Sequence, residues 1–127
     1  MTVIRCLLCV LLGGCVNSKF EPPVISDDVA LRFFCVDPTT KQADRIGQPA
    51  SDSLRRWLRV TLRERVDDWT PVYVSMTSGD CVARGDKFAV YFYSDGVRVT
   101  NSRLGGESSF WRPLSDAANY ARLQQAR

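Results

Sequence analysis

Cysteine is the most chemically reactive residue type in this chain, and histidine is absent. The 127 residues include five cysteines and no histidine. Without histidine there is no Ser-His-Asp or Cys-His nucleophile and none of the usual zinc ligand sets. The acidic pairs Asp27-Asp28 and Asp67-Asp68 could hold a cation or form a carboxylate dyad, but adjacent acids in turns are commonly just solvated. We therefore expect no enzyme, no cofactor and no metal site.

The most specific motif lies in the first fifteen residues. Arg5 precedes a short apolar run, Cys6 to Leu12, which is too short to cross a bilayer but suits the core of a secretory signal. The sequence Leu12-Gly13-Gly14-Cys15 resembles the lipobox of bacterial lipoproteins, where signal peptidase II cuts before a diacylated cysteine. The resemblance implies a signal peptide over residues 1–14 and a lipid on Cys15, whose sulfur forms the thioether.

The same resemblance implies a compartment. Val16, rather than aspartate, follows the lipidated cysteine. By similarity to enterobacterial lipoproteins, this favours sorting to the outer membrane, facing the periplasm. The formal net charge of +3 is small, whereas nucleic-acid binding needs a concentrated basic surface. We expect membrane association through the lipid, a protein partner in the periplasm, and no nucleic acid.

This interpretation accounts for all five cysteines. Cys6 and Cys9 leave with the signal peptide, Cys15 takes the lipid, and Cys35 and Cys81 remain. An even pair in an oxidising compartment predicts a disulfide, whereas a cytosolic chain would keep two buried free thiols. Such a bond would tie the apolar run around Cys35 to the segment at Cys81 across the core, stabilising the domain by about 3–4 kcal/mol in the chain-entropy model.

Composition and turn signals divide the rest of the chain. Residues 15–28 are polar and contain Pro22-Pro23, which predicts a lipidated tether. Residues 29–127 have the length of one domain. Its clearest strand is Lys87 to Tyr93, and Ser94-Asp95-Gly96 predicts a hairpin after it. Short strands between turns predict a mainly β fold, a small antiparallel sandwich or open barrel, with a short C-terminal helix over residues 114–125.

Residues 54–66 fit two templates. As a helix, Leu54, Trp57, Leu58, Leu62 and Val66 share one face, and Ser51 or Ser53 could cap it. As a strand, the apolar residues at 58, 60 and 62 alternate with arginine and threonine. We favour a strand over Trp57–Arg65 because β-type segments follow at once. The alternative is an α+β fold with a helix at 52–66.

Candidate partner-binding residues come from aromatic and arginine side chains. Trp69 and Trp111 each lie two residues before a proline in turn-like sequence, where partial exposure is expected, and interfaces favour tryptophan and arginine. Arg55 and Arg59 belong to an arginine-rich stretch that could form a cationic patch for an acidic partner or the solvated face of one element.

Together these features predict a binding module. A tethered β domain with two cysteines and the segment GDKFAVYFY is similar to small periplasmic lipoproteins proposed as immunity proteins of type VI secretion effectors. The similarity implies an inhibitor or immunity protein against a periplasmic toxin or hydrolase. The alternative is a structural lipoprotein subunit of a cell-envelope secretion or conjugation machine.

Overall fold

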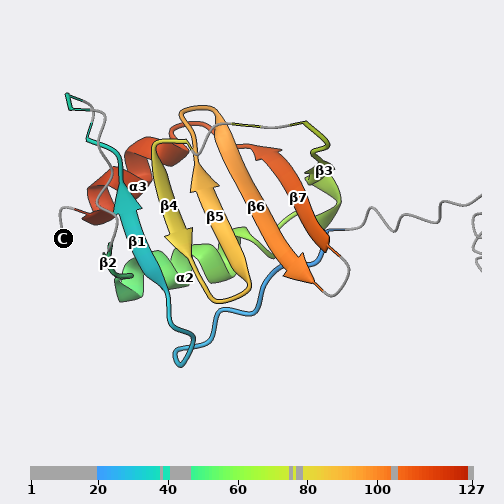
Figure 1. Cartoon of the computed structure of the whole chain (residues 1–127), viewed down its shortest axis with the longest axis horizontal. Coiled ribbons are helices and arrows are strands. Elements are labelled where there is room, and N and C mark those ends of the chain that lie inside the picture. The colour runs from blue at the N-terminus through green and yellow to red at the C-terminus, as the bar shows by residue number, and fades with distance from the viewer. Residues whose placement is uncertain are drawn as a thin grey trace, which may run out of the picture.

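A computed structural model describes residues 20–37, 39–40, 47–74, 76, 79–103 and 106–125. The expected signal peptide, Cys15 and the first part of the expected tether lie outside these residues. Seven strands form one open antiparallel sheet in the order β2-β1-β4-β5-β6-β7-β3 (Figure 1). The predicted mainly β, antiparallel fold with a short C-terminal helix is confirmed, and it is built on a single sheet.

The elements have the following bounds. The strands are β1 (Arg32–Cys35), β2 (Gln48–Pro49), β3 (Thr70–Pro71), β4 (Cys81–Arg84), β5 (Phe88–Phe92), β6 (Gly96–Arg103) and β7 (Gly106–Pro113). The helical elements are α2 (Asp52–Thr61), the 3-10 turn η1 (Val66–Asp68) and α3 (Ala117–Gln125).

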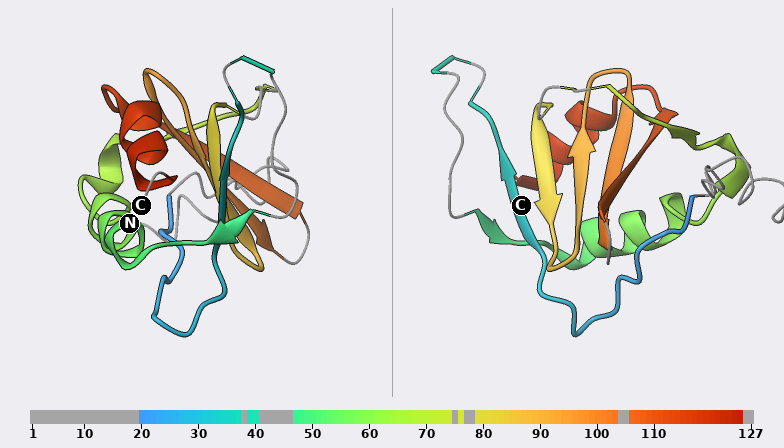
Figure 2. Two further views of the ribbon diagram at one scale, coloured as in Figure 1. Left: turned by 90° about the vertical axis from the view of Figure 1, so that its left-hand side faces the viewer. Right: turned by 45° about the vertical axis from the view of Figure 1, so that its right-hand side comes forward.

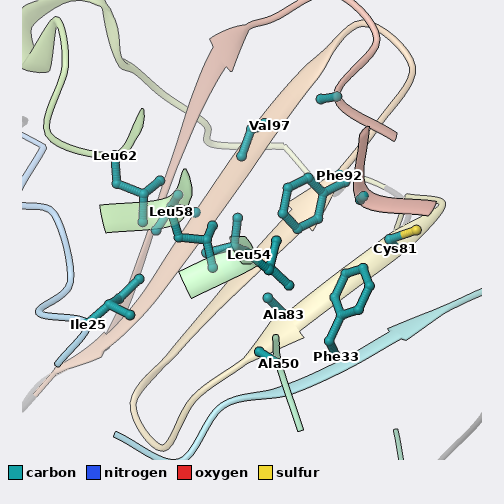
Figure 3. Packing of buried hydrophobic residues seen from close by; sticks show 14 of the residues in the cluster. Ile25, Phe33, Ala50, Leu54, Leu58, Leu62, Cys81, Ala83, Phe92 and Val97 are labelled. Carbon is teal, nitrogen blue, oxygen red and sulfur yellow. The ribbon is translucent and has the colours of Figure 1, made fainter. Parts of the chain in front are cut away.

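Both helices pack on the same face of the sheet (Figure 2). Along each strand successive side chains alternate between the faces, so every second residue of β5 and β6 points toward the helices. Figure 3 shows Leu54 and Leu58 of α2 lying over Phe92 and Val97 of the sheet, and all four are buried. This helix-facing side of the sheet is the hydrophobic core.

The strongest predicted strand lies at the centre of the sheet. The β5 strand pairs with β4 on one side and β6 on the other. Its hairpin forms where the turn residues predicted it, with the amide of Tyr93 donating to the carbonyl of Gly96 over 2.8 Å. Alternation and turn chemistry were enough to locate this unit because both are local signals.

The predicted strand over Trp57–Arg65 is wrong, because residues 52–61 form helix α2. The hydroxyl of Ser51 caps the helix by accepting the amide of Leu54 over 3.1 Å. Helical spacing places Leu54, Leu58 and Leu62 together on the sheet, and all are fully buried. A strand would instead have sent Val60 to the same side as Leu58. The helix ends before residue 66, and Arg65 adopts a left-handed conformation with φ of 46°.

Both sheet edges are short and carry proline. The edge strands β2 and β3 have two residues each, ending at Pro49 and Pro71. Proline cannot donate a ladder hydrogen bond, and short edges offer little backbone for unwanted pairing. The outer strands therefore discourage strand addition to the sheet.

Part of the predicted tether belongs to the folded domain. Phe20 and Ile25 are both buried in the core. The ring of Phe20 stacks on Trp69 with 4.3 Å between centroids and meets Phe110 edge-on at 5.4 Å. The domain thus includes residues before its predicted start at Val29. Polarity and two prolines indicated an extended segment, but they do not show whether Phe20 and Ile25 pack into the hydrophobic core.

Candidate functional site

The predicted disulfide is present and joins neighbouring strands. Cys35 and Cys81 are bonded, with Cα atoms 4.0 Å apart. They face each other directly in the β1–β4 register. The bond therefore pins two adjacent strands of one sheet and does not cross the core as expected. Both cysteines are buried.

Three of the four predicted partner-binding residues hold the N-terminal segment instead. Trp69 is only 5% exposed, so its expected exposure is wrong, and it packs on Phe20. Arg55 donates to the carbonyl of Val29 over 2.8 Å. Arg59 donates to the carbonyl of Ile25 over 2.9 Å. These side chains fasten residues 20–29 to the domain.

Trp111, the fourth, lies on the side of the sheet away from the helices. Figure 1 looks onto this side, with both described helices behind the strands; we call it the open face. Strand register sets a row of side chains across it, which runs Phe34, Val82, Tyr91, Arg98 and Trp111. Four strand spacings of about 4.8 Å give this row a width of about 19 Å.

The aromatic and arginine side chains of this face contact one another. The guanidinium carbon of Arg98 lies 4.2 Å from the ring centroid of Tyr91. Its Nε donates to the hydroxyl of Tyr93 over 3.2 Å. Tyr93 in turn meets Trp111 edge-on, with centroids 5.3 Å apart. The tyrosines thus hold Arg98 in one orientation.

A second pair extends the cluster toward β1. The guanidinium carbon of Arg84 lies 5.9 Å from the ring centroid of Phe34. Arginine over an aromatic ring gains about 0.5–1 kcal/mol at exposed sites. The residues that we call the aromatic–arginine face are Phe34, Arg84, Tyr91, Tyr93, Arg98 and Trp111. Arg84 is exposed and the other five are half-buried.

Gly96 makes room for the indole of Trp111. A Cβ atom at position 96 would lie 2.3 Å from Cζ2 of Trp111 and 2.7 Å from the carbonyl oxygen of Arg112. These separations are far below van der Waals contact, so the ring can lie over β6 only because residue 96 has no side chain. The hairpin motif predicted Gly96 as a turn residue and gave no sign of this second role.

The charged strand positions of the open face carry more positive than negative charge. Alternation places Arg32, Arg84 and Arg98 on it, together with Glu107. Sequence reasoning missed Arg84 and Arg98 as site residues. Only the register brings them beside aromatic rings, and no local signal could have identified them.

One aspartate of each acidic pair forms a surface ion pair. Asp27 contacts Arg59 at 2.9 Å, and Asp68 contacts Arg65 at 3.8 Å. Hydrogen bonds from the backbone amides of Thr40 and Thr39 lower the pKa of the exposed Asp37 carboxyl. In the described part of the chain, no group of three His, Cys, Asp or Glu side chains could hold a metal ion.

Two further findings concern the chain as a whole. Of the helices that the structure describes, none combines the length and apolarity needed to cross a membrane. Comparison with protein-family models, with curated proteins and with solved structures finds no match for this chain.

Proposed function

We propose that this protein is a lipid-anchored periplasmic binding module that captures an acidic protein surface on its aromatic–arginine face. The observation that carries the proposal is Arg98, which is held between Tyr91 and Tyr93 beside Trp111. The form of capture that we propose is inhibition of a periplasmic toxin or hydrolase, as an immunity protein does. The resemblance to such lipoproteins, which rests on a tethered β domain, two cysteines and the segment GDKFAVYFY together, supports this form.

The chemistry of the face suits a protein partner. Tryptophan, tyrosine and arginine are the residue types that dominate binding energy at protein interfaces. Here their mutual contacts restrict the side chains before binding, which lowers the entropy lost on association. Small-molecule sites are concave, whereas this row extends across five strands of one sheet. A broad surface of this kind matches another protein surface.

Charge selects the kind of partner. Arg84 and Arg98 contribute positive charge beside the rings, and Arg32 adds more on the neighbouring strand. Electrostatic complementarity speeds encounter and rejects wrong partners. A toxin or hydrolase surface with clustered carboxylates would meet these conditions. An inhibitor that covers such a surface needs only to bind it tightly and needs no catalytic group of its own.

The disulfide supports the proposed compartment. A disulfide such as the buried Cys35–Cys81 bond forms and persists in an oxidising environment such as the periplasm. The lipobox cysteine Cys15 supplies the proposed anchor, and Val16 points to the outer membrane. Cys15→Ser should remove the protein from the membrane fraction and block signal peptidase II processing, as fractionation beside the wild type would test. Membrane association of an unmodified Cys15→Ser chain would contradict the anchor.

The binding face is tested by site-specific cross-linking. A photoreactive residue in place of Tyr91, in the full chain expressed in its own host, should cross-link to a periplasmic protein identifiable by mass spectrometry. With that protein purified, Arg98→Glu should weaken affinity about a hundredfold, because truncating or reversing a central hot-spot charge costs more than 2 kcal/mol. Arg63→Glu is the matched control, since Arg63 is exposed beyond the end of α2.

Three outcomes would overturn the proposal. Arg98→Glu and Arg63→Glu could affect affinity equally, which would place the contact elsewhere. A single-stranded oligonucleotide could bind the aromatic–arginine face through Arg98 and displace the protein partner, which would make this face a nucleic-acid site. The captured protein could be part of a stable envelope assembly with no activity to inhibit, which would favour the structural-subunit alternative.

A further inference from the structure

Helix α2 and the turn that follows it present a stripe of three exposed side chains. Arg56, Val60 and Glu64 follow one another at intervals of four residues, about one helical turn each. The helical hydrogen bonding continues to the last of them, because the amide of Glu64 donates to the carbonyl of Val60 over 3.1 Å. The side chain of Val60 is 53% exposed although it is apolar.

The three residues of the stripe line one side of a hollow between α2 and α3. Its volume is about 740 Å³, and Trp57, Leu114 and Tyr120 contribute to its lining. Trp57 stacks on Tyr120 within this lining, with 4.9 Å between ring centroids. At its rim Leu123 of α3 is 64% exposed. Two large exposed apolar side chains, Val60 and Leu123, therefore border one hollow on the helix side of the molecule.

The charged ends of the stripe have no partner within the described part of the chain. The side chains of Arg56 and Glu64 form neither a hydrogen bond nor an ion pair there. They are eight residues apart, or about 12 Å along a helix, which is too far for an ion pair within one copy. Arg112 does fix the backbone here by donating to the carbonyl of Glu64 over 3.4 Å.

The geometry points to a second copy of this chain as the occupant of this surface. If two α2 helices pack antiparallel with Val60 on the two-fold axis, Arg56 of each copy lies opposite Glu64 of the other. Both ion pairs and the central apolar contact then form at once, as an isologous interface requires. Antiparallel packing also sets the helix dipoles in opposition, which is favourable. The stripe carries its own complement, so no other partner is needed to satisfy its charges.

Charge reversal gives a test that only self-association passes. In sedimentation equilibrium of the full-length protein in density-matched detergent, Arg56→Glu or Glu64→Arg alone should weaken dimerisation about tenfold or more, because each places like charges together. The combined Arg56→Glu/Glu64→Arg variant should recover to within about threefold of the wild type, since each pair is re-formed with its sign exchanged. Lys87→Glu, a charge reversal at an exposed residue in the turn between β4 and β5, outside the stripe, is the control.

A cysteine on the axis gives a second, independent readout. Val60→Cys should form a disulfide-linked dimer in intact cells, because the two copies of residue 60 meet. Val24→Cys is the control, since Val24 is 68% exposed but lies outside the stripe. A wild type that stays monomeric at every concentration, a combined variant that does not recover, or a Val60→Cys product containing another protein would each overturn the inference.

Discussion

Phe20 and Trp69 stack face to face, with 4.3 Å between their ring centroids and 23° between their planes. The contact joins the start of the described chain to the segment between α2 and β3. It explains why Trp69 is buried although its neighbours are turn formers. It also shortens any free tether, since the chain is held by the core from Phe20 onward.

Phe20→Ala should therefore destabilise the domain. Large-to-alanine substitutions at fully buried aromatic positions cost about 3–5 kcal/mol, and Phe20 is 2% exposed. Denaturant unfolding followed by far-ultraviolet circular dichroism would measure the change in free energy. Val24→Ala in the same segment should change it by less than about 0.5 kcal/mol. Equal stability of Phe20→Ala and the wild type would show that the segment is not part of the core.

Gly96→Ala should disturb the aromatic–arginine face. The new methyl group would overlap the Trp111 ring and the Arg112 carbonyl, and overpacking of this kind costs about 1–3 kcal/mol. The indole must move, so affinity for the cross-linked partner should fall together with stability. A variant with wild-type stability and affinity would contradict the assigned role of Gly96. Thermal unfolding and titration of the partner provide the two measurements.

Removing both cysteines should weaken the fold without changing its topology. The Cys35→Ala/Cys81→Ala variant should lose about 2–5 kcal/mol of unfolding free energy, the usual cost for a small domain. Both cysteines are buried, so a mild reductant should leave the native disulfide intact until the protein unfolds. Non-reducing mass spectrometry of material from the periplasm checks the bond, and two free thiols there would contradict it.

Asp37 should titrate at a lower pH in the folded protein than in the unfolded chain. Amides from Thr40 and Thr39 stabilise its carboxylate and lower its pKa. The resulting stabilisation is present above the unfolded pKa and is lost as pH falls through the folded one. Carboxyl-carbon NMR of the folded chain and of the chain in urea would compare the two midpoints. Asp37→Asn should abolish this part of the acid dependence, and equal midpoints would refute the prediction.

Local patterns in the sequence were sufficient for several elements. Alternation in Lys87 to Tyr93 and the Ser94-Asp95-Gly96 turn located the β5–β6 hairpin, which forms as predicted. The counting of cysteines predicted the Cys35–Cys81 bond. Each signal involves neighbours in sequence or a simple pairing rule, so one chain is enough to read it. The lipid on Cys15 stays a prediction from its motif.

The local sequence pattern at residues 54–66 did not distinguish a helix from a strand. Both templates placed Leu58 and Leu62 on an apolar side, and the tertiary packing that buries them while leaving Val60 exposed corresponds to helical spacing. The aromatic–arginine face has the same origin. Tyr91 and Arg98 are opposite each other because of the β5–β6 register, and Trp111 joins them through β7. Periodicity shows which way a side chain points, whereas its neighbours across strands follow from how the whole chain buries its apolar surface.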